Sequence, residues 1–302
     1  MTDKQSAWSD FWAQQRGGGD NGCLPARWQS VIAVLEQTWR SVAEDLAEDA
    51  CVLDLATGDA RVLHWMGQAR PGLERIGVDL SPQLPPGPEG VKLHTNVAME
   101  DLPFEDAKFD AVVSQFGVEY GKPEGVAREV ARVANDTARI AFVVHRGDGA
   151  ILAHNLARAE QIHWVLDEAR LIDTTKAALA REQAPWEDAT GAVAASVAEG
   201  RERYGDQSAG WEIPEAIRRT LLMGARAGDT AEGVGSVLDR IEAQAKNELA
   251  RITSLEGACA TADARDAFLG AFEAAGLRMT RSEELRDAAG RLFAEALHFE
   301  KG

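Results

Sequence analysis

The sequence predicts an α/β fold with a doubly wound, mostly parallel sheet and a helical insertion. Short apolar runs alternate with helix-length segments from residue 51 to residue 144, as they do in parallel sheets covered on both faces. A stretch rich in Ala, Glu, Arg and Leu at helical spacing then fills residues 150–265. Two short segments beyond it, 278–282 and 296–300, are expected to be strands, so the sheet is expected to be discontinuous in the sequence.

The N-terminal segment, residues 1–24, is predicted to be a flap in front of the first core helix. It contains three aromatic residues, Trp8, Phe11 and Trp12, and a run of glycines at 17–19. A helical pattern follows over residues 27–48. The aromatic side chains could cover a ligand, or they could pack on the core as one face of an amphipathic helix.

The most informative stretch is residues 51–61, where an apolar strand ending in Asp54 breaks into a turn of small residues. Ala56, Thr57 and Gly58 keep side chains small where the backbone must approach a ligand. A second strand, 75–79, ends in Asp79, 25 positions beyond Asp54. An acid at the carboxyl end of the second strand is placed to accept the ribose hydroxyls of a nucleoside.

The spacing of small residues in this loop distinguishes a dinucleotide cofactor from a nucleoside cofactor without phosphates. A dinucleotide fingerprint needs a third glycine where this chain has Arg61, so a pyrophosphate site is disfavoured. A nucleoside without phosphates needs only the close turn and the ribose acid. The pattern therefore favours S-adenosylmethionine.

Two further segments extend the pattern, Met-Glu-Asp-Leu-Pro-Phe at 99–104 and Phe-Asp-Ala-Val-Val-Ser-Gln-Phe-Gly-Val-Glu-Tyr at 109–120. With the acid loop and Asp79 in front of them, the chain resembles class I S-adenosylmethionine-dependent methyltransferases. It is most similar to the ubiquinone/menaquinone C-methyltransferase branch. The resemblance covers roughly residues 45–148, and residues 271–277 look like the helix and turn before that family's closing hairpin.

The resemblance implies a seven-stranded, Rossmann-like sheet. The methyltransferase core would comprise residues 25–149 and 266–302, with a fifth strand at 140–144 and a closing antiparallel hairpin at 278–282 and 296–300. Residues 150–265 would be a helical cap inserted between strands five and six. That insertion could shape the substrate site, or it could be a structural bundle or a homodimer contact.

The resemblance also implies which residues bind the cofactor, whose demethylated product would be S-adenosylhomocysteine. They are Asp54, Ala56, Thr57, Gly58, Asp79, Leu80, Asn96, Met99, Glu100, Ser114 and Gln115. The sequence departs from the family where Ala56 and Ala60 replace loop glycines and Ala98 replaces an acid near the adenine. Asn96 is then the nearest polar candidate for the adenine contact.

Methyl transfer from a sulfonium needs alignment and exclusion of water more than a nucleophilic residue. A hydroxyl or acidic-carbon acceptor would also need a general base at the carboxyl end of strand four or five. Glu119, Tyr120 and His145 are the candidates. Each has an alternative role: His145 could bond a loop, Glu119 could anchor a helix, and Tyr120 could be a pocket wall. Phe116 would line the acceptor channel, and in relatives an aromatic segment like that of Trp8, Phe11 and Trp12 forms a lid.

Composition narrows the partners and the location. A formal net charge of −17 argues against nucleic acid, whose binding depends on Lys and Arg. No apolar run suits a membrane span and no secretion signal is evident, so a cytoplasmic location is expected. Cys23, Cys51 and Cys259 are too widely spaced for a zinc site, and no metal is expected.

The sequence therefore predicts an S-adenosylmethionine-dependent methyltransferase acting on a small molecule. Two alternatives stay open. One is a non-catalytic protein that binds S-adenosylmethionine or S-adenosylhomocysteine, and the other is a different S-adenosylmethionine-dependent reaction on the same fold.

Overall fold

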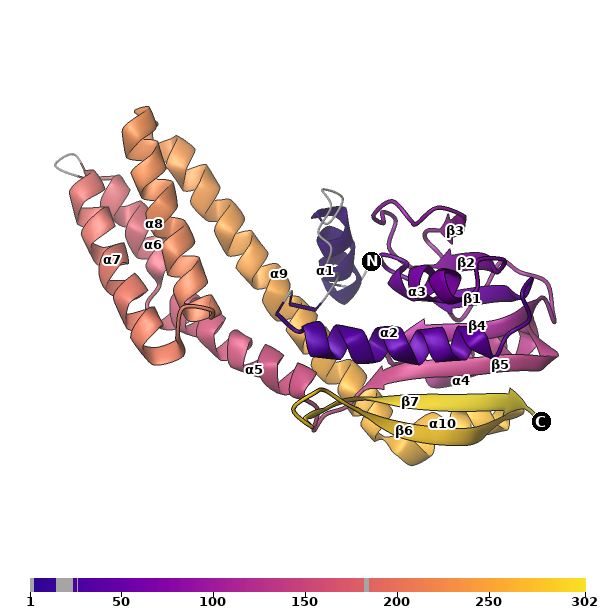
Figure 1. Ribbon diagram of the computed structural model, residues 1–302. Coiled ribbons are helices and arrows are strands. Elements are labelled where there is room, and N and C mark those ends of the chain that lie inside the picture. The colour runs from indigo at the N-terminus through magenta and orange to yellow at the C-terminus, as the bar shows by residue number, and fades with distance from the viewer. Residues whose placement is uncertain (1–2, 15–23, 26, 182–184) are drawn as a thin grey trace. The chain divides into compact units, whose positions relative to one another are not determined.

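The computed structural model describes residues 3–14, 24–25, 27–181 and 185–302 (Figure 1). The chain forms two compact units. The first comprises Met1–Ala153 together with Thr253–Gly302, and the second comprises His154–Ile252. The long helices α5 (Ala150–His163) and α9 (Ala231–Asp263) each contribute residues to both units.

The first unit is built on a seven-stranded sheet with the strand order β3-β2-β1-β4-β5-β7-β6. The strands are β1 (Cys51–Leu55), β2 (Glu74–Val78), β3 (Val91–His94), β4 (Phe109–Gln115), β5 (Ala134–His145), β6 (Leu277–Arg286) and β7 (Leu292–Lys301). The pairings among β1 to β5 are parallel, whereas β7 pairs antiparallel with both β5 and β6. The prediction of a mostly parallel sheet is corrected accordingly, because the closing hairpin makes the sheet mixed.

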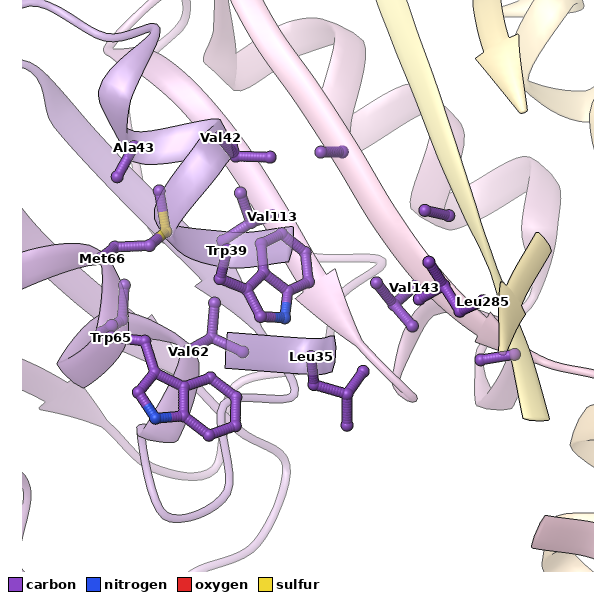
Figure 2. Close-up of a cluster of buried hydrophobic side chains, with 14 of the residues drawn as sticks. Leu35, Trp39, Val42, Ala43, Val62, Trp65, Met66, Val113, Val143 and Leu285 are labelled. Carbon is purple, nitrogen blue, oxygen red and sulfur yellow. The ribbon is translucent and has the colours of Figure 1, made fainter. Parts of the chain in front are cut away.

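Helices cover both faces of this sheet. On one face α2 (Gln29–Glu44) and α3 (Arg61–Ala69) pack on alternate strand residues, and Figure 2 shows Trp39 of α2 and Met66 of α3 among them. On the other face α4 (Pro123–Val133) and α10 (Arg265–Ala274) bury Phe268 and Phe272 against Phe142. Alternation of side chains along the strands divides the core between the two faces.

Three strands are longer than the segments that predict them. β5 begins at Ala134 instead of residue 140. The prediction missed its first part because residues 135–137 are polar. The hairpin strands also extend beyond 278–282 and 296–300. β6 is an edge strand whose middle is exposed and charged, as edge strands commonly are, so an apolar pattern does not reveal it.

The second unit is helical. Between the ends of α5 and α9 it contains a π-helical turn (Trp164–Glu168), α6 (Leu171–Leu179), α7 (Pro185–Tyr204) and α8 (Ala209–Ala227). Its own core includes Trp164, Ile217 and Leu238, each less than 5% exposed. The helices of this unit bury their apolar faces in this core, which is separate from the core of the first unit.

The N-terminal segment contains helix α1 (Asp3–Gln14), and a helix was named in one of the two alternatives for this segment. The glycine run at 17–19 lies outside the described residues. Trp12 of α1 is buried, and Trp8 and Phe11 are partly buried.

Candidate active site

The loop after β1 is a tight turn of small residues, of which Thr57, Gly58 and Ala60 are buried. Ala56, Gly58 and Ala60 all have left-handed backbones, with φ of 54°, 54° and 57°, before α3 starts at Arg61. Alanine tolerates this conformation less well than glycine, so two strained residues are held here by their surroundings. Such strain clusters at functional sites, which agrees with the predicted ligand loop.

Thr57 is fixed by a contact that the sequence analysis missed. A Cβ placed on Gly77 of β2 would lie 2.6 Å from Thr57 Oγ1, so only glycine leaves room for the threonine there. Thr57 also donates its N–H to Val78 O (2.9 Å) and its hydroxyl to Asp54 Oδ2 (2.6 Å). A glycine inside a strand marks a close approach, and that signal could have revealed this contact.

Asp54 is a buried acid with an unused oxygen. Its Oδ2 accepts from Thr57, but its Oδ1 accepts no hydrogen bond from any described residue. Burial raises the pKa of Asp54 to about 8, and the nearby acids Asp59 and Asp79 add to the increase. A buried oxygen without a donor is costly unless something else supplies one, so Asp54 is suited to a ligand that is cationic or donates hydrogen bonds.

This raised pKa predicts how stability changes with pH. The unfolded carboxyl has a pKa of about 3.9, so over the range from about 4 to about 8 only the folded state keeps the proton. The stabilisation is complete below about pH 4 and is lost as the pH rises through about 8. Melting temperatures of the ligand-free protein should fall over this range, and Asp54→Asn should flatten the curve. Parallel curves for the two proteins would contradict the assignment.

Asp79 joins the second strand to the same loop. Its Oδ2 accepts from Gly58 N–H (3.0 Å) and its Oδ1 accepts from Ser81 N–H (2.8 Å). Burial raises the pKa of Asp79 too, and the two backbone donors oppose that rise. Through the Gly58 bond, the predicted ribose acid is in direct contact with the predicted loop. Leu80, the residue after Asp79, is a large apolar side chain that is 45% exposed.

The predicted adenine-side residues divide into two groups. Asn96 is exposed in a left-handed conformation, and its N–H donates to Ser81 O (3.2 Å), which keeps it close to the Asp79 turn. Glu100 Oε1 instead accepts from Lys122 N–H (2.8 Å) at the start of α4, and Met99 Cε approaches Gly121. Glu100 thus anchors a helix, and its role toward the cofactor stays a prediction.

Ser114 and Gln115 at the end of β4 have partners within the protein. Ser114 Oγ donates to Leu55 O (2.8 Å), and Gln115 Oε1 accepts from Trp39 Nε1 (2.8 Å). These bonds tie β4 to β1 and to α2. The two side chains hold the carboxyl edge of the sheet in place, and their role toward the cofactor stays a prediction.

A second cluster lies at the ends of β4 and β5. Glu119 Oε1 accepts from the backbone N–H of His145 (2.9 Å) and from its ring at Nδ1 (2.8 Å). Phe116, in a left-handed backbone conformation, stacks on the imidazole with ring centres 4.1 Å apart. Tyr120 meets the same ring edge-on at 6.0 Å. The three predicted catalytic residues are thus brought together.

The aromatic side chains of α1 connect this cluster to the loop. A Cβ on Gly58 would lie 2.4 Å from Trp12 Cζ2, so the Trp12 ring rests directly against the loop. Ring contacts then run from Trp12 to Phe11 (5.0 Å), to Trp8 (5.8 Å) and to Tyr120 (5.8 Å). The predicted lid residues therefore form a continuous row beside both clusters.

Of the three cysteines, Cys51 and Cys259 lie within the described residues and Cys23 lies outside them. Burial raises the pKa of Cys51 to about 11 and that of Cys259 to about 12, so both thiols stay protonated. The described part of the chain has no group of three or more His, Cys, Asp or Glu arranged to hold a metal. Among its helices, none combines the length and the apolar character of a membrane span.

Comparison with known proteins identifies the domain that contains this site. Residues 53–142 match a family model described as a methyltransferase domain. The match over this segment agrees with the predicted methyltransferase activity and with the predicted S-adenosylmethionine cofactor. The finer resemblance to ubiquinone/menaquinone C-methyltransferases stays a prediction. No curated protein matches the sequence.

Solved structures with similar folds fall into two groups. The YcgJ protein of Bacillus subtilis is 19% identical, with a TM-score of 0.33, over 44% of this chain and 59% of that protein. The PH0226 protein of Pyrococcus horikoshii OT3 is 22% identical, with a TM-score of 0.32, over 39% and 58%. This chain thus spans less than two thirds of either protein.

Another solved structure is matched over nearly its whole length. Geranyl diphosphate C-methyltransferase from Streptomyces coelicolor A3(2), solved with Mg²⁺, geranyl diphosphate and S-adenosyl-L-homocysteine, is 11% identical, with a TM-score of 0.46, over 100% of this chain and 99% of that protein. At this identity and score we draw no conclusion about the substrate from the likeness.

Proposed function

We propose that this protein transfers a methyl group from S-adenosylmethionine to a small molecule. The observation that supports this most is the pair of buried acids at one tight loop. Asp54 keeps an oxygen without a donor, and Asp79 holds the loop through Gly58. A ligand with a positive charge and a pair of hydroxyls suits these acids, and S-adenosylmethionine has both.

The chain's own residues would bind and orient the cofactor. The Ala56–Ala60 turn would receive its amino-acid portion, Asp54 would face its positive charge, and Asp79 would accept from the ribose. Leu80 and Asn96 would lie along the adenine. When bound, the cofactor supplies an activated methyl group, so the protein needs only to align an acceptor and exclude water.

The remaining predictions belong to this proposal. The α1 side chains Trp8, Phe11 and Trp12 would form the lid, and the helical insertion would shape the acceptor site or mediate self-association. The net charge of −17 favours small acceptors over nucleic acid, in a cytoplasmic protein. Light scattering tests the self-association, since a monomer would remove the homodimer from this proposal.

Methyl-labelled S-adenosylmethionine tests the function directly. Incubated with the protein and a cell extract, the label should enter the small-molecule fraction, and Asp79→Asn should greatly reduce transfer. Label in nucleic acid or protein would contradict the small-molecule assignment, and binding without any transfer would favour the non-catalytic alternative. Removal of residues 1–14 should lower the rate, whereas an unchanged rate would contradict the lid.

A further inference from the structure

We propose that His145 is the general base of this reaction, that Glu119 positions it, and that the acceptor is a small phenol. This inference rests on the proposed function, because it assigns the acceptor half of the same site. Three features support it: the hydrogen bonding of the imidazole, the difference in exposure between the two side chains, and the aromatic surroundings.

The hydrogen bond between the two side chains fixes which imidazole nitrogen is the base. Since Glu119 Oε1 is an acceptor, Nδ1 of His145 carries the proton that bridges the 2.8 Å between them. The lone pair is then on Nε2, and no described residue hydrogen-bonds to that atom. A histidine held in one tautomer by a carboxylate is the arrangement that general-base catalysis uses.

Exposure assigns the two roles. The His145 side chain is 8% exposed, whereas that of Glu119 is completely buried. An acceptor can therefore reach the imidazole but not the carboxylate. Glu119 also accepts the backbone N–H of His145, so it fixes both the ring and the strand end that carries it. Glu119 is thus a positioning residue.

Charged groups also surround the pair. A cavity beside His145 is lined by Arg146, Asp148, Asp263, Arg265 and Glu295, and both arginines are paired with acids of that set. The other titratable groups nearby are Tyr120, beside Glu119 in the chain, and Cys259 of α9, which interacts electrostatically with Glu119. Burial raises the pKa of Cys259 to about 12, so its thiol is neutral.

Geometry places the base within reach of the cofactor loop. β1, β4 and β5 are consecutive parallel strands, and His145 lies three residues beyond Phe142, the β5 residue level with Leu55, so the ends of β1 and β5 lie roughly 14 Å apart on one edge of the sheet. The segments after β1 and β4 touch, because a Cβ on Gly117 would lie 2.7 Å from Ala56 Cβ. We place the acceptor between the loop and the imidazole.

Aromatic rings define the class of acceptor. Phe116 and Tyr120 contact the imidazole, and Trp8 contacts Tyr120 edge-on. Such walls favour a flat, apolar molecule, and a base at their centre is useful only if that molecule has an ionisable proton. A phenol has both properties.

The reaction step is balanced by these groups. The phenol oxygen attacks the methyl carbon in line with the carbon–sulfur bond. An oxygen–carbon bond forms as the carbon–sulfur bond breaks, and the electron pair of the broken bond stays on sulfur. The hydroxyl proton moves to Nε2 of His145 and then to solvent. The products are the methyl ether, S-adenosylhomocysteine and one proton.

Calorimetry with S-adenosylhomocysteine comes first, so that the two proposals fail separately. If the native protein does not bind S-adenosylhomocysteine, the proposed function is overturned and this inference with it. Given binding, the native protein should methylate simple phenols, which are the probes. Transfer to amines or thiols but to no phenol would overturn the acceptor class alone.

Variants test the roles of the pair. His145→Ala should retain S-adenosylhomocysteine binding and lose roughly 100- to 10,000-fold in rate with phenol. It should lose far less with 4-nitrophenol at a pH where that phenol is already ionised. His64→Ala, which changes an exposed histidine, is the matched control. A rate equal to the native rate with phenol, or equal losses with both phenols, would overturn the base assignment.

Glu119→Gln separates positioning from general structure. The amide can still accept the ring proton, so the fold and cofactor binding should persist. Because a neutral amide stabilises the imidazolium less than a carboxylate does, the rise of rate with pH should move to lower pH. A lower rate with an unmoved pH profile would overturn the positioning role.

Discussion

Replacing Asp79 with Asn is expected to weaken binding of S-adenosylhomocysteine by roughly 10- to 100-fold. A hydrogen bond to a charged group contributes about 1.5–3 kcal/mol, and the substitution removes the charge that the ribose hydroxyls would meet. It also places an amide NH₂ where Asp79 now accepts from Gly58 and Ser81. Isothermal titration of both proteins measures the effect.

Asp49→Asn is the matched control for this substitution. Asp49 is exposed, next to the start of β1, and the same chemical change there should leave affinity unchanged. Thermal unfolding of both variants verifies that they are folded. Native affinity in a folded Asp79→Asn protein would remove Asp79 from the cofactor site.

Replacing Gly77 with Ala is expected to lower both stability and cofactor affinity. The new Cβ would lie 2.6 Å from Thr57 Oγ1 and 2.7 Å from its Cγ2, so Thr57 must move. Overpacking of this kind costs about 1–3 kcal/mol. Movement of Thr57 also breaks its 2.6 Å bond to Asp54, which disturbs the loop. Thermal unfolding and titration with S-adenosylhomocysteine measure the two effects.

Gly270→Ala makes the same chemical change in open space. No atom lies within 4 Å of a Cβ at that position in α10, so the variant should be as stable as the native protein or slightly more stable. If Gly77→Ala melted and bound like Gly270→Ala, the close contact between Thr57 and β2 would be contradicted.

Much of the fold could be predicted because its signals are local. The strand containing Asp54, the acid after the second strand and the helical spacing of residues 150–265 are each visible in short windows of sequence. The exposed edge strand β6 and the polar start of β5 were underestimated because their residues are not apolar. The sheet is mixed because β7 is antiparallel to both of its neighbours, and this closing hairpin was implied by the family resemblance rather than by a local pattern.

The site was predictable in its residue types but not in its contacts. Position after a strand was enough to select Asp54, Asp79, Glu119 and His145. The pairing of Glu119 with His145, 26 positions apart, depends on the tertiary fold. For the same reason sequence could not show that Ser114, Gln115 and Glu100 are engaged within the protein.

The most direct test of the central claim is isothermal titration of the native protein with S-adenosylmethionine and with S-adenosylhomocysteine, using NADH as the control. Micromolar binding of the first two and none of NADH is the predicted result. Binding of NADH alone, or no binding of either S-adenosyl compound, would contradict the assignment of Asp54, Asp79 and the loop between β1 and α3 as the cofactor site.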